Sequence, residues 1–310
     1  MKQKKIDFDN NKTLLSVVGA HDVHLKKMSS LLGIDMKHKG NQIILSGDNA
    51  LFPRAEKVLT ALYDQAAVSG DITDSELEAV VRTNGENFSK DLTLRTKKKH
   101  ISPRSARQGA YIDLMNKYEM VFGLGPAGTG KTFLAVAKAI TMMLDGEVDK
   151  IILSRPAVEA GENLGFLPGD LKEKIDPYLQ PLYDALYEMM PNEWVDKRIE
   201  TGEIEIAPLA FMRGRTLSRA FVILDEAQNT TTMQMKMFLT RLGEGSRMVV
   251  NGDLSQTDLP RGQMSGLEDA VHLLDGVKGI ASLTFTEEDV VRHGLVAKII
   301  KAYEAKAKRY

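Results

Sequence analysis

At 310 residues the chain has room for two domains, and its lack of cysteine excludes disulfide frameworks, cysteine–zinc sites and thiol catalysis. The charged start MKQKKIDFDN precedes no apolar run, and no stretch approaches the roughly 20 apolar residues of a membrane span, so we expect a soluble cytoplasmic protein. Residues 1–110 contain 18 Lys and Arg against 13 Asp and Glu, and the remaining residues contain 23 against 29. The basic excess of the N-terminal part fits either an acidic partner or a solvated face.

The N-terminal pattern predicts a small α/β unit over residues 13–66, in the order strand, helix, strand, strand, helix. The apolar, β-branched run TLLSVVG predicts the first strand, and the spacing in HLKKMSSLLG predicts a helix that ends at Gly33. IDMKHKG and NQIILSGD predict two strands joined at Gly40-Asn41, before a helix over residues 50–67.

A basic stretch follows a short predicted helix at residues 71–82. It is either a solvated tether or a strap that contacts the phosphates of a nucleic acid. Its basic residues are Lys90, Arg95, Lys97, Lys98, Lys99, Arg104 and Arg107.

From about residue 110 onward, short apolar strands alternate with helix-length segments. This alternation predicts a parallel sheet covered by helices on both faces. The predicted strands are MVFGLG, KIILSR, EIEIAP, AFVILD, RMVVNG and ASLTF.

A phosphate-binding loop follows the first of these strands and precedes a helix. It matches the pattern G-x-x-x-x-G-K-[ST] in full, and its glycines let successive N–H groups point at phosphate oxygens. Lys131 is expected to reach the β- and γ-phosphates, and the Thr132 hydroxyl is expected to bind Mg²⁺. The nucleotide-binding residues are Gly125, Pro126, Ala127, Gly128, Thr129, Gly130, Lys131 and Thr132.

Two acidic residues end the strand FVIL. Because Mg²⁺ needs a second anchor at this edge of the sheet, we assign Asp225 to the metal, through a bound water. Glu226 is placed to act as the general base for water. Gln256, past the strand RMVVNG, is either a sensor of the γ-phosphate or an ordinary loop residue.

The threonines at 230–232 are expected to cap the helix that follows them. Met233, Met235 and Met237 in that helix are expected to pack into the core.

With these motifs, the chain resembles the PhoH-like family of bacterial P-loop ATPases. Further blocks carry the resemblance: SRPAVEAGENLGFLPGDL, KIDPYLQPLYDAL, IEIAPLAFMRGRTL, FVILDEAQNTT, GDLSQTDLP and DVVRHG. The resemblance implies an α/β RecA-like core with a parallel sheet, related to one motor domain of superfamily 1 helicases, and a small N-terminal KH-like domain. The expected segments are 1–70, KH-like; 71–107, short helix and basic linker; and 108–310, ATPase.

The resemblance also implies further site residues. Gln108 would recognise the adenine edge, unless it is a simple linker residue. Arg155 would touch a nucleic-acid strand, or pair with Glu159 or Glu162. The chain lacks the second motor domain that supplies catalytic arginines, so the resemblance implies a homo-oligomeric ring with an arginine acting in trans. Arg292 is the first candidate, followed by Arg213 and Arg215.

KH-like domains bind single-stranded RNA through a G-x-x-G loop, but here that place reads Gly19-Ala20-His21-Asp22. The missing second glycine and the Asp22 charge disfavour clamping of the phosphate backbone. Binding could instead use basic residues nearby. These are Lys26, Lys27, Lys37 and Lys39.

Three functions follow, and the first is favoured. It is an ATP- and Mg²⁺-dependent enzyme that remodels RNA; ATPase activity follows from the residues named above, whereas a helicase role in RNA processing or ribosome maturation is what the resemblance implies. The second is a nucleotide-gated RNA-binding adaptor that recruits a nuclease without unwinding. The third, a small-molecule kinase, is disfavoured because Glu226 would activate water.

Overall fold

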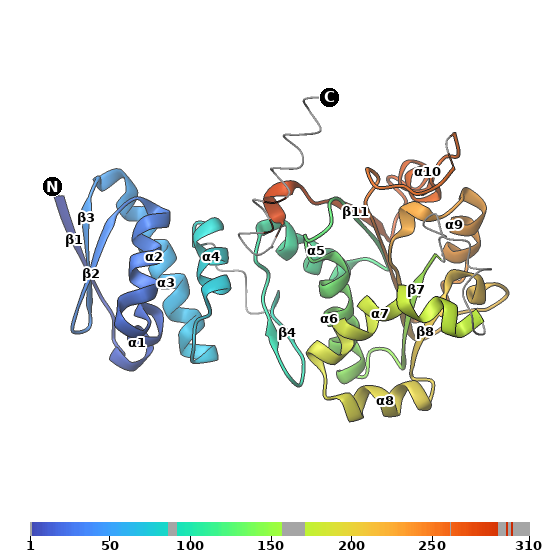
Figure 1. The fold of residues 1–310 in the computed structure, drawn as a ribbon, viewed down its shortest axis with the longest axis horizontal. Coiled ribbons are helices and arrows are strands. Elements are labelled where there is room, and N and C mark those ends of the chain that lie inside the picture. The colour runs from blue at the N-terminus through green and yellow to red at the C-terminus, as the bar shows by residue number, and fades with distance from the viewer. Residues whose placement is uncertain are drawn as a thin grey trace. The chain divides into compact units, whose positions relative to one another are not determined.

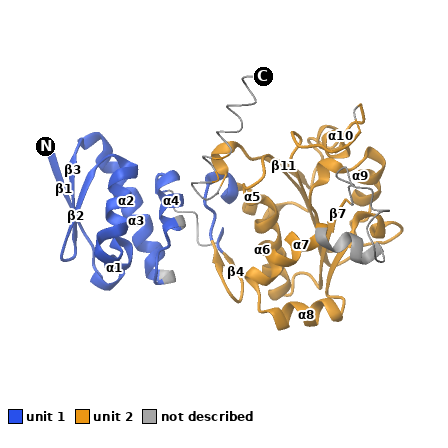
Figure 2. Ribbon diagram, in the orientation of Figure 1, with its two compact units in different colours: residues 1–93, 102–109 blue, residues 94–101, 110–310 orange. Residues whose placement is uncertain are grey.

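The structure is a computed structural model that describes residues 2–85, 92–156, 171–260 and 262–290, with positions 296 and 299. It divides the chain into two compact units (Figure 2). Unit 1 comprises residues 1–93 and 102–109, and unit 2 comprises residues 94–101 and 110–310. None of the helices within the described ranges is long and apolar enough to cross a membrane.

Unit 1 is a three-stranded antiparallel sheet in the order β1-β3-β2, packed against helices (Figure 1). Leu14, Ile43 and Leu59 are fully buried between the sheet and the helices. The described elements are β1 (Lys2–Asp7), α1 (Asn11–Val18), α2 (Val23–Leu32), β2 (Asp35–Lys39), β3 (Gln42–Gly47), α3 (Phe52–Ser69) and α4 (Asp74–Arg82).

The strand expected at TLLSVVG is wrong, because this run forms helix α1. Its apolar residues Leu14, Val17 and Val18 are buried on one helical face. The Asn10 side chain caps the helix by accepting hydrogen bonds from the Lys12 and Thr13 N–H groups at 2.9 and 3.2 Å. Burial and capping therefore outweigh the β propensity of the valines, and the first strand is the charged segment before them.

The short helix predicted at residues 71–82 is confirmed as α4, and part of the basic stretch after it is folded as well. Helix α4 begins with a capping box between Thr73 and Glu76 and packs on α2 and α3, inside unit 1. In unit 2, β4 (Leu94–Arg95) and β5 (His100–Ile101) form a hairpin. Lys98 donates its N–H to the Met189 carbonyl at 3.0 Å, and Lys99 pairs with Glu188 at 2.6 Å. Because of these contacts, residues 94–101 are folded against unit 2 and are not a solvated tether. Lys90 lies outside the described residues.

Unit 2 contains a six-stranded parallel sheet in the order β11-β6-β10-β9-β7-β8. All six predicted strands are confirmed, and with them the α/β fold class with a parallel sheet. The strands are β6 (Met120–Leu124), β7 (Lys150–Arg155), β8 (Ile204–Pro208), β9 (Ala220–Leu224), β10 (Arg247–Gly252) and β11 (Ile280–Thr284).

Helices cover both faces of this sheet (Figure 1). Phe238 and Leu267, from α9 and α10, share a buried cluster with alternate strand residues such as Phe122. Helix α6 contacts β7, β9 and β10 but contributes nothing to that cluster, so it covers the other face. The helices are α5 (Ala106–Lys117), α6 (Lys131–Leu144), α7 (Leu171–Met189), α8 (Asn192–Glu200), α9 (Thr232–Leu239) and α10 (Gly266–Leu273).

Helix α9 confirms the predicted threonine cap, since Thr231 forms a capping box with Gln234. Of the methionines expected in the core, Met235 is buried and Met237 is partly buried. Met233 is 82% exposed, so the packing role expected for it is wrong.

Candidate functional site

Four neighbouring strands bring the site residues to one edge of the parallel sheet. Strands β6, β10, β9 and β7 lie side by side, and their carboxyl ends lead into the P-loop, Asp253, Asp225 and Arg155 respectively. Open parallel sheets bind ligands at this edge. A cavity of about 240 Å³, open to solvent, lies here. Its lining is Ala127, Gly128, Gly130, Lys131, Thr132, Phe133, Asp225, Glu226, Gly252, Asp253 and Gln256.

The P-loop takes a shape that its glycines make possible. Gly125, Gly128 and Gly130 have φ values of 122°, 85° and 84°, which other residues rarely adopt. A Cβ atom at Gly125 would lie 2.4 Å from the Phe285 carbonyl oxygen. The loop leads directly into α6, whose first N–H groups are free to meet an anion.

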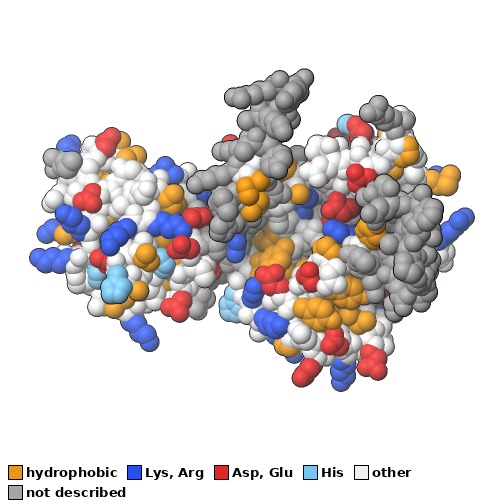
Figure 3. Space-filling view, in the orientation of Figure 1, with side chains coloured by type: hydrophobic (Ala, Val, Ile, Leu, Met, Phe, Trp, Pro, Cys, Tyr) orange, Lys and Arg blue, Asp and Glu red, His pale blue; other side chains and the backbone are white. Residues whose placement is uncertain are grey.

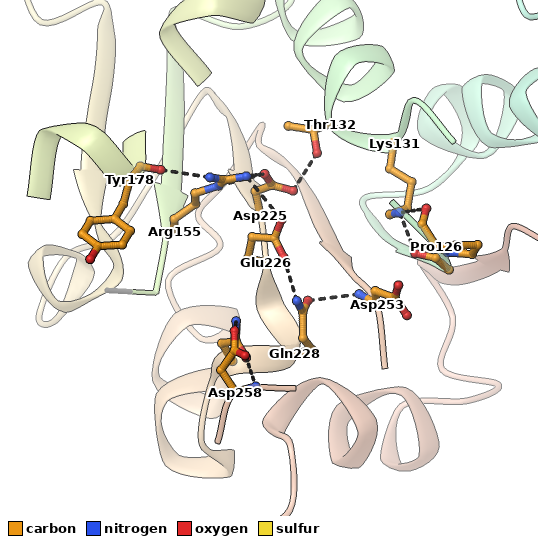
Figure 4. A network of polar contacts seen from close by, with 12 residues as sticks. Pro126, Lys131, Thr132, Arg155, Tyr178, Asp225, Glu226, Gln228, Asp253 and Asp258 are labelled. Carbon is orange, nitrogen blue, oxygen red and sulfur yellow. Dashed lines mark hydrogen bonds and ion pairs between the residues drawn. The ribbon is translucent and has the colours of Figure 1, made fainter. Parts of the chain in front are cut away.

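Lys131 is folded over the P-loop (Figure 4). Its Nζ donates to the carbonyl oxygens of Gly125 and Pro126 at 2.6 and 2.8 Å. Burial lowers the pKa of Lys131, and the carboxylates of Asp225, Asp253 and Glu226 oppose that shift. The ammonium group is thus held by neutral acceptors inside a cavity that carries negative charge.

Thr132 and Asp225 meet across the cavity, although they lie 93 residues apart. The Thr132 hydroxyl donates to Asp225 Oδ1 at 2.6 Å. Hydroxyl and carboxylate oxygens suit Mg²⁺, which proteins usually hold through one or two carboxylates, substrate phosphates and water. No group of three or more His, Asp or Glu able to hold a metal occurs in the described part of the chain. The residues therefore fit a Mg²⁺ ion that arrives with phosphates.

Glu226 is held at both carboxylate oxygens. Oε1 lies 3.3 Å from Arg155 Nη2, and Oε2 accepts a 2.6 Å hydrogen bond from Gln228 Nε2. Gln228 Oε1 in turn accepts from the Asp253 N–H at 3.0 Å. Glu226 has φ 54° and ψ 36°, a left-handed backbone that is uncommon outside glycine and recurs at functional sites.

Arg155 is a site residue that the sequence did not assign to the carboxylates. Its Nε and Nη2 both donate to Asp225 Oδ2, at 2.9 and 2.7 Å, and its Nη1 donates to the Tyr178 carbonyl at 2.9 Å. The predicted partners Glu159 and Glu162 lie outside the described residues. The sequence shows only that each residue lies at the end of an apolar strand; the structure, in which β7 and β9 are neighbours, brings the two together.

A second contact that sequence reasoning missed lies beneath the P-loop. The Tyr111 hydroxyl donates to Asn251 Oδ1 at 2.6 Å, and both side chains are fully buried. A Cβ atom at Gly123 would lie 2.5 Å from Asn251 Oδ1 and 2.8 Å from the Tyr111 oxygen. The glycine in β6 therefore makes room for this hydrogen bond, which ties α5 to the end of β10.

The remaining assigned residues are spread more widely. Gln256 is exposed at the cavity rim. Gln108 belongs to the 102–109 segment of unit 1, is 4% exposed, and accepts a 2.6 Å hydrogen bond from the Arg104 N–H. Arg292 lies outside the described residues. Arg215 is engaged by Glu205 through bonds of 2.6 and 2.7 Å, whereas Arg213 is exposed.

In unit 1 the residues 19–22 join α1 to α2. His21 and Asp22 both have left-handed backbones, with φ values of 54° and 59°. Lys26 Nζ donates to the His21 carbonyl at 3.2 Å, and Lys27 pairs with Asp74 and Glu78. On the face of unit 1 seen in Figure 3, basic side chains are interspersed with acidic ones.

Comparison with known proteins matches this chain to a family model and to curated relatives. The model described as "PhoH-like protein" matches residues 100–304. A "PhoH-like protein" of Bacillus subtilis (strain 168) is 48% identical over 298 residues, which cover 94% of this chain and 93% of that protein. "Protein PhoH" of Escherichia coli (strain K12) is 46% identical over 205 residues, covering 66% of this chain and 58% of that protein.

Solved structures match less well. The UvsW helicase from Bacteriophage T4 has a TM-score of 0.36 and 12% identity, covering 76% of this chain and 78% of its own. Pif1 helicase from Candida albicans has a TM-score of 0.31 and 16% identity, covering 59% of this chain and 40% of its own.

Proposed function

This chain is a P-loop protein that belongs to the PhoH-like protein family, and we propose that it hydrolyses ATP with Mg²⁺ and couples hydrolysis to RNA. The observation that supports hydrolysis best is the 2.6 Å hydrogen bond from Thr132 to Asp225. It joins, beside a complete P-loop, the hydroxyl and the carboxylate that a nucleotide-borne Mg²⁺ requires.

Nucleotide binding uses groups that already point into the cavity. The P-loop N–H groups and the start of α6 receive the phosphates. Lys131 exchanges its present acceptors, the carbonyls of Gly125 and Pro126, for oxygens of the β- and γ-phosphates. This exchange matches the buried ammonium with a negative charge, which stabilises the charged form that burial disfavours.

Thr132 and Asp225 are the residues that would hold Mg²⁺, which neutralises charge on the phosphates when it is bound. Arg155 keeps the Asp225 carboxylate turned toward Thr132 by occupying its other oxygen. In this arrangement each oxygen of Asp225 has a fixed neighbour.

Glu226 orients the attacking water and accepts its proton in the in-line displacement at the γ-phosphate. Gln228 and Arg155 fix the direction of its carboxylate. Gln256, at the cavity rim, contacts the γ-phosphate and responds to its presence. Adenine recognition by Gln108 is what the family resemblance implies.

The RNA part of the proposal is supported by membership of the PhoH-like protein family and by the separate compact unit 1 at the N-terminus. Lys26 and Lys39 are exposed in unit 1 and would contact RNA phosphates. Remodelling is preferred to an adaptor role because the general-base role proposed for Glu226 supports turnover.

The test is steady-state ATP hydrolysis with and without single-stranded RNA. Stimulation by RNA is expected, and strand separation assays then distinguish remodelling from an adaptor that binds without unwinding. Hydrolysis indifferent to RNA would contradict the coupling and favour a switch that acts on a protein partner.

The control variants separate binding from chemistry. Glu226→Gln is expected to bind ATP normally and to lose about 10²–10⁴-fold in turnover, because the base is removed and its shape is kept. Lys131→Ala is expected to weaken nucleotide binding itself. Normal turnover by Glu226→Gln would refute the assignment of the base.

A further inference from the structure

Asp253 lies inside the nucleotide cavity, and none of the roles above uses its carboxylate. It directly follows β10, the strand between the P-loop strand β6 and the strand β9 that leads to Asp225. It is 8% exposed, so its charge is almost completely withdrawn from bulk water. A buried carboxylate needs hydrogen-bond donors or a cation.

One oxygen of Asp253 is satisfied and the other is not. Oδ1 accepts hydrogen bonds from the N–H and the hydroxyl of Ser255, at 3.0 and 2.7 Å. Oδ2 is buried and has no hydrogen-bond partner among the described residues. Figure 4 shows the carboxylate turned away from Gln228, on the side where Lys131 and Pro126 lie. An acceptor in this position is expected to meet a donor that comes with the ligand.

Lys131 is a poor choice for that donor. Its Nζ already donates to two carbonyl oxygens and to Thr129 Oγ1, and the phosphates take it over when nucleotide binds. Direct coordination of a metal by Asp253 is disfavoured as well. Thr132 and Asp225 already supply the hydroxyl and the carboxylate that a nucleotide-borne Mg²⁺ takes from the protein, and its remaining positions are filled by phosphates and water.

A water molecule bound to the metal could donate to Oδ2 without involving Lys131 and without direct coordination of the metal by Asp253. Mg²⁺ releases its waters reluctantly and keeps several of them when it binds through phosphates and a carboxylate. We propose that Asp253 Oδ2 accepts a hydrogen bond from a water bound to the nucleotide's Mg²⁺, so that Asp253 is a water-mediated anchor for the metal. This inference rests on the proposed function of the cavity.

The position of Asp253 links this anchor to the base. Its backbone N–H is held by Gln228 Oε1, and Gln228 Nε2 holds Glu226. A single side chain, Gln228, therefore connects the Asp253 backbone to the carboxylate proposed as the base.

The experiment measures how much Mg²⁺ strengthens nucleotide binding, with no turnover involved. A fluorescent ADP analogue is titrated into the full chain in EDTA and in excess Mg²⁺, and the ratio of the two Kd values is compared between variants. Asp253→Asn keeps Oδ1 for Ser255 and replaces only Oδ2. In this variant the ratio of the Kd in EDTA to the Kd in Mg²⁺ is expected to fall about tenfold or more, the usual loss when a group that hydrogen-bonds to a metal's ligands is removed. The Kd in EDTA is expected to stay within about twofold of the wild-type value.

Asp258→Asn is the matched control. Asp258 lies on the same loop but does not line the cavity, and its carboxylate accepts a hydrogen bond from Asn229 at 3.2 Å. The control is expected to keep the wild-type response to Mg²⁺.

Two results would overturn the inference. An unchanged response to Mg²⁺ in Asp253→Asn means that no metal-bound water uses Oδ2. An equal loss in EDTA and in Mg²⁺ means that Asp253 acts on Lys131 or on the phosphates directly. Failure of the wild-type chain to bind nucleotide in either medium would overturn the proposed function as well, so the two failures are distinguishable.

Thermal unfolding in EDTA tests whether the substitution merely destabilises the folded chain. Because Oδ2 has no donor among the described residues, Asp253→Asn is expected to keep or raise the melting temperature without Mg²⁺. If the Asn variant does not fold, Asp253→Ser is measured in the same way. The ratio of its Kd values in EDTA and in Mg²⁺ then tests the role proposed for Asp253.

Discussion

At the scale of single residues, the site depends on side chains that orient other side chains. Arg155 is 17% exposed, and it contacts Asp225, Glu226 and the Tyr178 carbonyl at once. A guanidinium can do this because its donors form a planar fork, which a lysine lacks. Arg155 therefore acts through the two carboxylates as a positioning residue.

Arg155→Gln is expected to lower kcat about 10- to 100-fold and to leave the KM for ATP within about threefold, because the nucleotide contacts stay while the carboxylates lose their orientation. Arg155→Lys should restore little of the loss, since one ammonium cannot reproduce the fork. Steady-state kinetics of both variants provide the measurement.

The control for Arg155 is Arg219→Gln, which breaks another two-bond pair, with Asp149 at 2.6 and 2.8 Å, on the surface. It should leave kcat unchanged. A parallel rise in KM and fall in melting temperature for Arg155→Gln, with kcat intact, would contradict the positioning role.

At the scale of elements, the N-terminal cap and the buried face of helix α1 decide how the N-terminal segment folds. The run after Asn10 has residues of high β propensity, yet it is helical because one face is buried and the first turn is capped. The alternative, a strand, would expose alternate apolar residues that α1 buries together.

Asn10→Ala is therefore expected to lower the free energy of unfolding by about 1 kcal/mol, the usual loss for an N-cap. Urea unfolding of the full chain, followed by circular dichroism, is the measurement. Lys12→Ala, an exposed change in the same helix, serves as the control. Equal stability of Asn10→Ala and wild type would mean that the cap contributes nothing.

At the scale of the whole molecule, the described part of the chain holds one parallel sheet with its P-loop. Because a catalytic arginine would then have to come from outside this unit, we propose that a neighbouring copy supplies one to each site. Arg215 is engaged by Glu205 within its own unit, which leaves Arg213 and Arg292 as the better choices. Arg213 is exposed in the structure.

Mixing two inactive variants tests this arrangement. Arg213→Ala or Arg292→Ala is combined with Glu226→Gln in equal amounts, and ATP hydrolysis is measured. If an arginine acts in trans, about a quarter of the sites in the mixed assembly pair an intact Glu226 with an intact arginine, so activity returns to roughly that level. No recovery with either arginine variant, or a fully active monomer, would contradict the proposal.

The sequence alone was enough for features whose cause is local. The glycines of the P-loop, the apolar strands of unit 2 and the acidic pair after FVIL each depend on a few adjacent residues. Their secondary structure follows from short-range preferences, and the position of Asp225 beside Thr132 follows because strand ends of a parallel sheet share one edge.

Only the tertiary structure decided the contacts that complete the site. Arg155 meets Asp225 across 70 residues, and Tyr111 meets Asn251 across 140, because the strand order makes β7 a neighbour of β9 and brings α5 beneath β10. The helical state of α1 likewise depends on burial against the rest of unit 1. Such outcomes depend on which elements become neighbours, and that choice is made by the packing of the whole core rather than by any short segment.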